Sequence, residues 1–391
     1  MLRRPGSDPT VVFIESGSWQ AFLDLAGALR TAGVGITRVT IRSATRRTRL
    51  VSLVESGVFD RTLRLVEGGR ASGTAPDLNG PEVAAALDLE RVDIQAQDDL
   101  VPALLRDELV PAYRRLAEGV DPAVVADKAV QAAWASTAGV ATPDSWSSPD
   151  DVPLPAIVKA PVGSGGQGVR VVTTPDELEL AWIDLTDAAG RPPFAQRLLR
   201  KSVSTGGVAL DGRVLVGTAY DGHPAADDPT GPPAVVVAVD DEEVMDLTRR
   251  VLAEIGYTGL FCIDWVRDED GAAYLIDLNA RVFGSWVALQ ALGLDLLGAY
   301  LHTLGIAPEP QPTRATLGRA EPTLRYPCPT TSTPSAVRSW RRESLAIVRR
   351  RRGWLGDRWA LAVWVRTEIG TVSALARVAR RRQVTRPAAS R

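Results

Sequence analysis

The segment YLIDLNAR, residues 274–281, brings three different polar groups together after an apolar run. Asp277, Asn279 and Arg281 alternate with apolar residues in this segment. Because successive side chains of a strand point to opposite faces, an extended chain places all three polar groups on one face. A carboxylate and an amide oxygen there suit a hard cation, and a guanidinium beside them suits a phosphate.

A second carboxylate, Asp264, lies on the apolar run that precedes this segment. If the Asp-Gly pair at residues 270–271 forms a two-residue hairpin turn, Asp264 faces Asp277 with Cβ atoms about 4.5–5.5 Å apart. Like charges so close are destabilising unless a cation lies between them. The sequence therefore predicts a metal site of Asp264, Asp277 and Asn279 for Mg²⁺, or Mn²⁺ in its place, shared with nucleotide phosphates. Arg281 would neutralise charge on a transferring phosphoryl group.

A glycine-rich segment, GSGGQG at residues 163–168, follows the apolar run AIVK. The pattern G-x-G-x-x-G also occurs in dinucleotide-binding folds, where a helix begins at the loop. Here the segment VRVV continues instead as a strand, which favours a glycine hairpin of the kind that folds over phosphates. Lys159 lies on the incoming strand, four residues before the first glycine, and is placed to reach a phosphate beneath the loop. It is one of three lysines among 45 basic residues, so its compact point charge is an unusual choice in this chain.

The surrounding patterns predict the elements that must position these groups. Alternating strands and helices predict a small α/β domain over residues 1–118. A helix is predicted from 121 to 139, and a hairpin that turns at the Asp-Gly pair 211–212. One more helix is predicted around 285–305, before a Pro- and Thr-rich linker at 307–336.

Composition argues against several kinds of site and segment. Two cysteines and two histidines are too few for a disulfide framework or a Cys/His zinc site. Neither a signal peptide nor a membrane span is expected. The nearest approach to a span, WALAVWVRTEIGTVSALA at residues 359–376, is interrupted by Arg366 and Glu368.

Five segments in this order resemble the ATP-grasp superfamily, in particular its carboxylate–amine ligases. They are ADKAVQAAWASTAGVATP, AIVKAPVGSGGQGVRVV, FAQRLL, GYTGLFCIDWV and LIDLNAR, and the resemblance runs from about Asp121 to Gly305. It implies an α/β chain with the α+β ATP-grasp fold. The implied N-terminal part is a Rossmann-like pre-ATP-grasp domain (1–118). The ATP-grasp domain follows (119–306) and consists of a lid-bearing subdomain (119–200) and a metal-binding subdomain (201–306). A linker with a basic helical C-terminal extension (307–391) forms the last part.

The resemblance also implies roles for individual residues. The ATP-binding residues would be Lys128 and Lys159 at the phosphates, Gly163, Ser164, Gly165, Gly166 and Gly168 in the mobile loop, Gln196, Arg197 and Leu198 along the adenine edge, and Ile157 and Ile276 against its ring. Asp264, Asp277 and Asn279 would hold the metal, while Arg281 and Lys159 would act in catalysis. The chain departs from the family at Arg197, where an acidic residue usually follows the hinge glutamine, and at Asp277, where glutamate is commoner.

By this resemblance the reaction is ATP-dependent and ADP-forming: a carboxylate is activated as an acyl phosphate and joined to an amine or another nucleophile. Charge neutralisation and positioning would supply most of the catalysis. The implied partners are small-molecule carboxylate and amine substrates in the cytoplasm, and no motif encodes their identity. A second hypothesis is a catalytically inactive ATP-binding module that its basic tail tethers to a membrane or a partner.

Positive charge is concentrated in the tail. Residues 338–391 contain 15 arginines against three acidic residues, a balance of +12; because the whole chain carries -2, the remainder carries -14. Tryptophans at 340, 354, 359 and 364 are interleaved with these arginines. Three interpretations remain open: an amphipathic helix at an anionic membrane surface, helices docked on the acidic body or on a second copy of the chain, and a nucleic-acid contact. Tryptophan among aliphatic residues favours the first two.

Overall fold

The computed structural model describes residues 10–15, 19–41, 55–65, 92–97, 116–163, 168–186, 190–199, 201–223, 233, 235–311, 313–320 and 333–384. The strands are β1 (Thr10–Glu15), β2 (Gly35–Ile41), β3 (Arg61–Leu65), β4 (Val92–Ala96), β5 (Ser145–Trp146), β6 (Ala156–Lys159), β7 (Val169–Val172), β8 (Phe194–Arg197), β9 (Lys201–Leu210), β10 (Arg213–His223), β11 (Val235–Val239), β12 (Gly259–Arg267), β13 (Ala273–Asn279) and β14 (Arg319–Ala320). The helices are α1 (Gln20–Thr31), α5 (Lys128–Thr137), α6 (Pro175–Asp184), α7 (Glu242–Glu254), α8 (Trp286–Ala291), α9 (Leu296–Thr303) and α10 (Pro334–Val384), with short 3₁₀ helices at Pro122–Val125 and Pro149–Asp151.

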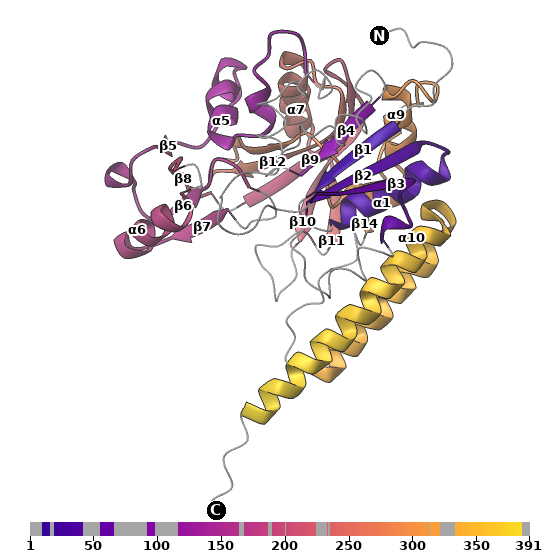
Figure 1. The fold of residues 1–391 in the computed structure, drawn as a ribbon. Helices are drawn as coiled ribbons and strands as arrows, with labels where there is room; N and C mark the ends of the chain where they lie inside the picture. Colours follow the sequence, from indigo (N-terminus) through magenta and orange to yellow (C-terminus); the bar gives the residue numbers. More distant parts are fainter. Residues whose placement is uncertain are drawn as a thin grey trace, which may run out of the picture.

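A parallel sheet of order β3-β2-β1-β4 forms the N-terminal part of the fold (Figure 1). One of its two inner strands, β1, is buried on both faces, as parallel strands between two layers usually are. Val11 and Phe13 pack with α1, while Val12 and Ile14 pack into a second core on the other face. The strand β1 followed by the helix α1 agrees with the alternation of strands and helices predicted for this part of the chain.

The largest sheet is antiparallel and has the order β13-β12-β9-β10-β11-β14. Helices α8 and α9 cover one face and α7 covers the other. The β9–β10 hairpin turns through Asp211 (φ 48°) and Gly212 (φ 80°), a two-residue turn in which both residues take left-handed conformations. This confirms the predicted turn. We propose the domain boundaries expected from the sequence, near residues 118, 200 and 306.

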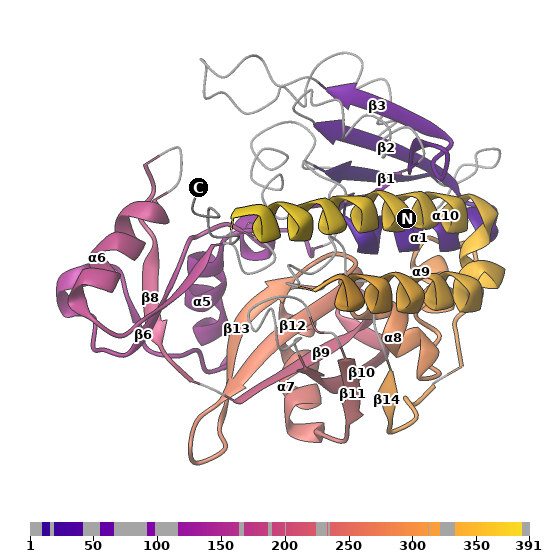
Figure 2. The same cartoon turned by 90° about the horizontal axis from the view of Figure 1, so that it is seen from below.

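A smaller antiparallel sheet, β5-β8-β6-β7, lies beside the largest one (Figures 1 and 2). Its outer face packs on α6, which begins at Thr174 with a capping box between Thr174 and Glu177. Ala156, Val158 and Ala195 point toward that helix. Since side chains alternate along a strand, the residues between them face the other way.

Several predicted elements differ in detail from the observed ones. The helix expected over 121–139 is two helices, because Asp121 caps the first and Asp127 caps the second. The helix expected around 285–305 is likewise divided into α8 and α9, with Gly293 (φ 97°) and the cap Asp295 between them. The linker contributes β14, which pairs with β11.

The C-terminal extension folds as a helical hairpin within α10. The two arms meet at Gly356, whose φ of 84° breaks the helix. The closed end of the hairpin packs on α1, where the indole Nε1 of Trp359 donates to Asp24 at 2.7 Å. Trp354 packs edge-on against Trp286 of α8, with ring centroids 5.9 Å apart. Of the three interpretations of the tail, docking on the body is therefore observed for this end.

A buried ion network also joins the extension to the N-terminal sheet. Arg366 of α10 lies 3.3 Å from Glu55, and Arg38 of β2 bridges Glu55 and Glu15. All four side chains are at most 2% exposed, so each charge needs its partner. In the described part of the chain, no helix is long and apolar enough to cross a membrane.

We predict that Gly27→Ala in α1 lowers the free energy of unfolding. A Cβ at Gly27 would lie 2.6 Å from the carbonyl oxygen of Leu355 and 3.0 Å from the Cβ of Trp359. The overpacking should exceed the gain in helix propensity and leave a net loss of about 1–2 kcal/mol, measured by urea denaturation. Gly353→Ala is the matched control, because nothing lies within 4 Å of its added Cβ, and it should stabilise slightly. Equal gains for both variants would contradict the close packing of α10 on α1.

Candidate active site

The inner face of the small sheet looks toward the β12–β13 hairpin. Ile157 and Gln196 are direct cross-strand partners on this face, as are Lys159 and Phe194. The Nζ atom of Lys159 donates to the carbonyl oxygen of Ile276 in β13 at 3.3 Å. The two sheets therefore meet here, and Ile157, Lys159 and Ile276, expected around the nucleotide, lie on the facing surfaces.

The register of the β12–β13 hairpin places Asp264 directly opposite Asp277, as predicted. The predicted two-residue turn is wrong, because Arg267 already pairs with Ala273 and the loop spans 268–272. A bulge next to Asp264 corrects the difference: Trp265 pairs with Leu275, so Ile276 is an extra residue before Asp277. The two carboxylates therefore face each other because a β-bulge shifts the strand pairing, and not because the pairing is regular.

Each carboxylate already has a partner. Lys128, the first residue of α5, forms an ion pair through its Nζ with Asp277. Ser204 Oγ donates to Asp264 at 2.7 Å. Burial raises the pKa of Asp264, and the facing Asp277 raises it further, which shows that negative charge is crowded here. A cation between the carboxylates would relieve that crowding.

The oxygen atoms that these side chains offer fit a hard divalent cation whose other ligands are phosphate oxygens. The structure's described residues include no cluster of three or more His, Cys, Asp or Glu side chains. The protein would thus supply Asp264, Asp277 and the amide oxygen of Asn279, leaving positions for phosphate oxygens and water, as Mg²⁺ prefers. The Nδ2 of Asn279 lies 3.5 Å from Asp264, and its Oδ1 accepts from Arg281 at 2.8 Å.

Lys159 is the more deeply buried of the two lysines, with 4% of its surface exposed. Burial lowers its pKa to about 8; Lys128 adds to the decrease, and Asp277 and Asp264 oppose it. The helix that carries Lys128 is also tied to the glycine segment, because the backbone N–H of Lys128 donates to Pro161 at 2.8 Å. Ala160 N–H donates to Gly168 at 2.8 Å and draws the two ends of the loop together.

Arg281 is buried between the end of β13 and the N-terminal sheet. Its guanidinium lies over the ring of Trp19, with Cζ 4.3 Å from the centroid. Trp19 precedes α1, and its backbone N–H donates to Glu15 at 3.1 Å. The N-terminal part of the fold therefore helps to set the direction of Arg281, a role for Trp19 that the sequence did not reveal.

Sequence reasoning also missed Gln131 on α5. Its amide donates to the carbonyl oxygen of Leu278 and accepts from the Leu278 N–H, both at 3.0 Å. Leu278 lies between Asp277 and Asn279 on an edge strand, whose backbone groups would otherwise lack partners. The only sequence signal for Gln131 is a polar residue on the buried side of a helix.

The three residues expected along the adenine edge, Gln196, Arg197 and Leu198, have different surroundings. Gln196 is 2% exposed and donates to Ser145 Oγ at 3.1 Å. Arg197 uses its backbone N–H for Asp144 at 2.9 Å and turns its side chain to the ring of Tyr274, Cζ 5.4 Å from the centroid. Leu198 follows directly after the strand. Of the loop, Gly163 and Gly168 are described, whereas Ser164, Gly165 and Gly166 lie outside the described residues.

No protein-family model and no curated protein matches this sequence, but solved structures match its fold. Carboxyaminoimidazole ribonucleotide synthase from Aspergillus clavatus, complexed with ATP, has a TM-score of 0.57 at 14% identity and covers 79% of this chain and 79% of its own. The biotin carboxylase domain of Hydrogenobacter thermophilus 2-oxoglutarate carboxylase, with MgADP and bicarbonate, has a TM-score of 0.53 at 16% identity and covers 80% of this chain and 72% of its own.

An L-amino acid ligase from Bacillus licheniformis matches with a TM-score of 0.52 at 15% identity, covering 76% of this chain and 74% of its own. At these identities the likeness establishes the fold. The fold expected from the sequence agrees with these matches. It also agrees with the parallel N-terminal sheet and with the two antiparallel sheets that meet at the β12–β13 hairpin. The chain therefore has the ATP-grasp fold.

Proposed function

We propose that the chain is an ATP- and Mg²⁺-dependent ligase that activates a carboxylate as an acyl phosphate and joins it to an amine or another nucleophile, releasing ADP. The observation that carries the proposal is the direct pairing of Asp264 with Asp277 beside Lys128 and Lys159. Two carboxylates next to two lysines form a better binding site for a metal-bound polyphosphate than a set of ion pairs that serves stability alone. The neighbours that bind ATP or MgADP support the same chemistry.

Each residue has a role that follows from its position. Lys128 and Lys159 would hold phosphate oxygens, and Asp264, Asp277 and Asn279 would hold Mg²⁺, which neutralises phosphate charge when bound. Arg281, 7% exposed, would stabilise charge on the phosphoryl group as it passes to the substrate carboxylate. Burial of this centre would also keep water from the acyl phosphate.

The substrates we propose are small molecules, one with a carboxylate and one with an amine. The structural neighbours include an L-amino acid ligase and a carboxylase solved with bicarbonate, which fit this class. We place the protein in the cytoplasm. The alternative, an inactive ATP-binding module, is favoured by the lack of acidic residues around the hinge, where Arg197 replaces the usual acidic residue and turns its side chain to Tyr274.

ADP release over a matrix of amino acids, other carboxylates and amines tests the ligase. We expect wild-type protein to release ADP with at least one pair, and Asp277→Ala to lower that rate about 100-fold or more while the far-ultraviolet circular dichroism stays unchanged. Asp270→Asn, an exposed acid on the same hairpin, is the matched control and should keep full activity. Tight ATP binding without turnover for any pair would favour the inactive module.

The lowered pKa of Lys159 predicts a pH dependence of nucleotide binding. Below pH about 8 the lysine is already charged in the free protein, so affinity for ADP should vary little with its titration. Above pH about 8 a proton must be taken up on binding, and affinity should fall by up to about tenfold per pH unit. Calorimetric titrations across this range measure the effect. Lys159→Arg stays charged throughout and should lose the inflection; an unchanged inflection would mean that another group causes it.

A further inference from the structure

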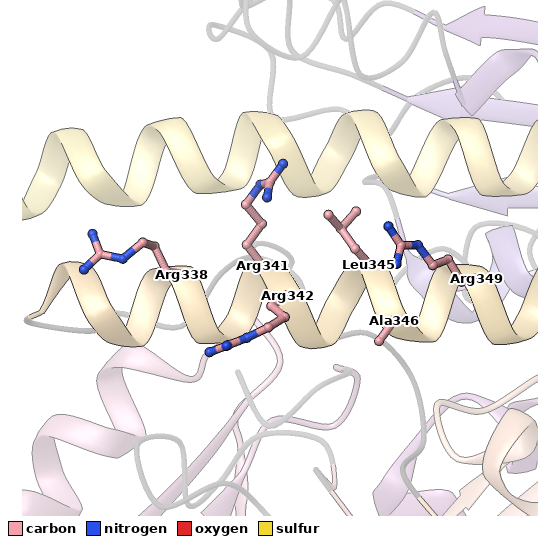
Figure 3. A pocket seen from close by; sticks show the side chains of 6 residues that line it. All are labelled: Arg338, Arg341, Arg342, Leu345, Ala346 and Arg349. Atoms are coloured by element: carbon pink, nitrogen blue, oxygen red, sulfur yellow. The ribbon is translucent and has the colours of Figure 1, made fainter.

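The first arm of α10, residues 334–355, presents a stripe of arginines to solvent. Arg338, Arg342 and Arg349 follow helical spacing along one face, and all three are exposed. None of them has an acidic partner among the described residues. Together with Arg341, Leu345 and Ala346 they line an open groove of about 520 Å³ (Figure 3).

The second arm carries an apolar stripe that nothing in the described chain covers. Leu361, Trp364 and Val372 are 56%, 46% and 68% exposed and share one helical face. In soluble proteins a tryptophan usually lies in a buried position, as Trp359 does five residues earlier on the other face. The exposed stripe is therefore not needed to dock the hairpin.

The two stripes lie on adjoining surfaces of the hairpin. Arg341 of the first arm donates from Nε to Glu368 of the second arm at 3.0 Å. Arg341 is one turn from Arg338, and Glu368 is one turn from both Trp364 and Val372. Glu368 therefore lies between Trp364 and Val372 on the apolar stripe, and the ion pair joins this stripe to the basic one.

The open part of the hairpin projects beyond the sheets (Figure 1). Its closed end is fixed by Trp359 and Arg366, which contact α1 and Glu55. From there both arms run outward, and the open end extends beyond the sheets in Figure 1. The open end is held together by its own small core of Val337, Trp340 and Ala374.

We propose that this outer face of α10 binds an anionic phospholipid surface. Exposed arginines suit lipid phosphates, and tryptophan, leucine and valine beside them suit the boundary between headgroups and acyl chains. A second copy seated face to face would oppose arginine to arginine, which disfavours self-association through this surface. A nucleic acid would use the arginines but would leave the aliphatic stripe without a partner. The proposal does not depend on the ligase activity.

Flotation of the full-length protein with vesicles tests the surface. We expect binding to vesicles that contain phosphatidylglycerol and none to vesicles of phosphatidylcholine alone. Because each basic residue near such a surface strengthens binding several-fold, replacing Arg338, Arg342 and Arg349 with Gln should weaken it about 100-fold. The matched control replaces Arg213, Arg249 and Arg250, exposed arginines of β10 and α7, and should bind far more tightly than the α10 variant.

A second pair of variants separates lipid from other anions. Leu361→Ser with Trp364→Ser should also weaken vesicle binding, while Leu180→Ser on α6 should not, although Leu180 is 63% exposed. Duplex DNA binding that exceeds vesicle binding and ignores the two serine substitutions would overturn the proposal in favour of a nucleic-acid contact. Dimerisation that the serine substitutions abolish, without vesicle binding, would overturn it in favour of self-association. Absence of vesicle binding by the wild-type chain would also refute it.

Discussion

The crowding of Asp264 and Asp277 on one hairpin is the constraint around which this molecule is built. Two carboxylates that face each other in a partly buried position are unstable without positive charge nearby. Lys128 arrives from α5, Lys159 from β6 and Arg281 from the end of β13, so three separate parts of the chain supply that charge. Two carboxylates and three cationic side chains leave a positive balance, which suits the net negative charge of a metal–polyphosphate complex.

The strand that carries Asp277 needs support because it lies at the edge of its sheet. Gln131 satisfies the backbone of Leu278, and Gln95 of β4 accepts from the N–H of Val282 at 2.9 Å. The N-terminal sheet also fixes Trp19 under Arg281 through Glu15. Glu15 belongs in turn to the buried network that ends at Arg366 of α10, so the C-terminal hairpin is part of the same framework.

Local patterns were sufficient to predict the main strands and the facing of the two carboxylates, and the resemblance to the ATP-grasp superfamily predicted the type of fold. The turn that was assumed for this facing is wrong, since a loop over 268–272 and a bulge before Asp277 compensate each other. Gln131 and Trp19 were missed because their partners lie far away in the sequence, where periodicity carries no information. Arg366 was predicted only to interrupt an apolar run; its partner Glu55 lies on another element, and their pairing depends on tertiary packing.

The most direct test of the metal site is a crystal structure with Mn²⁺ and a non-hydrolysable ATP analogue. The account predicts an anomalous peak between Asp264 and Asp277, with metal–oxygen distances of about 2.1–2.2 Å to the carboxylates and further ligands from the phosphates. Lys128 would then leave Asp277 for a phosphate oxygen. Bound nucleotide with no metal between these two carboxylates, or with the metal held elsewhere, would contradict the account.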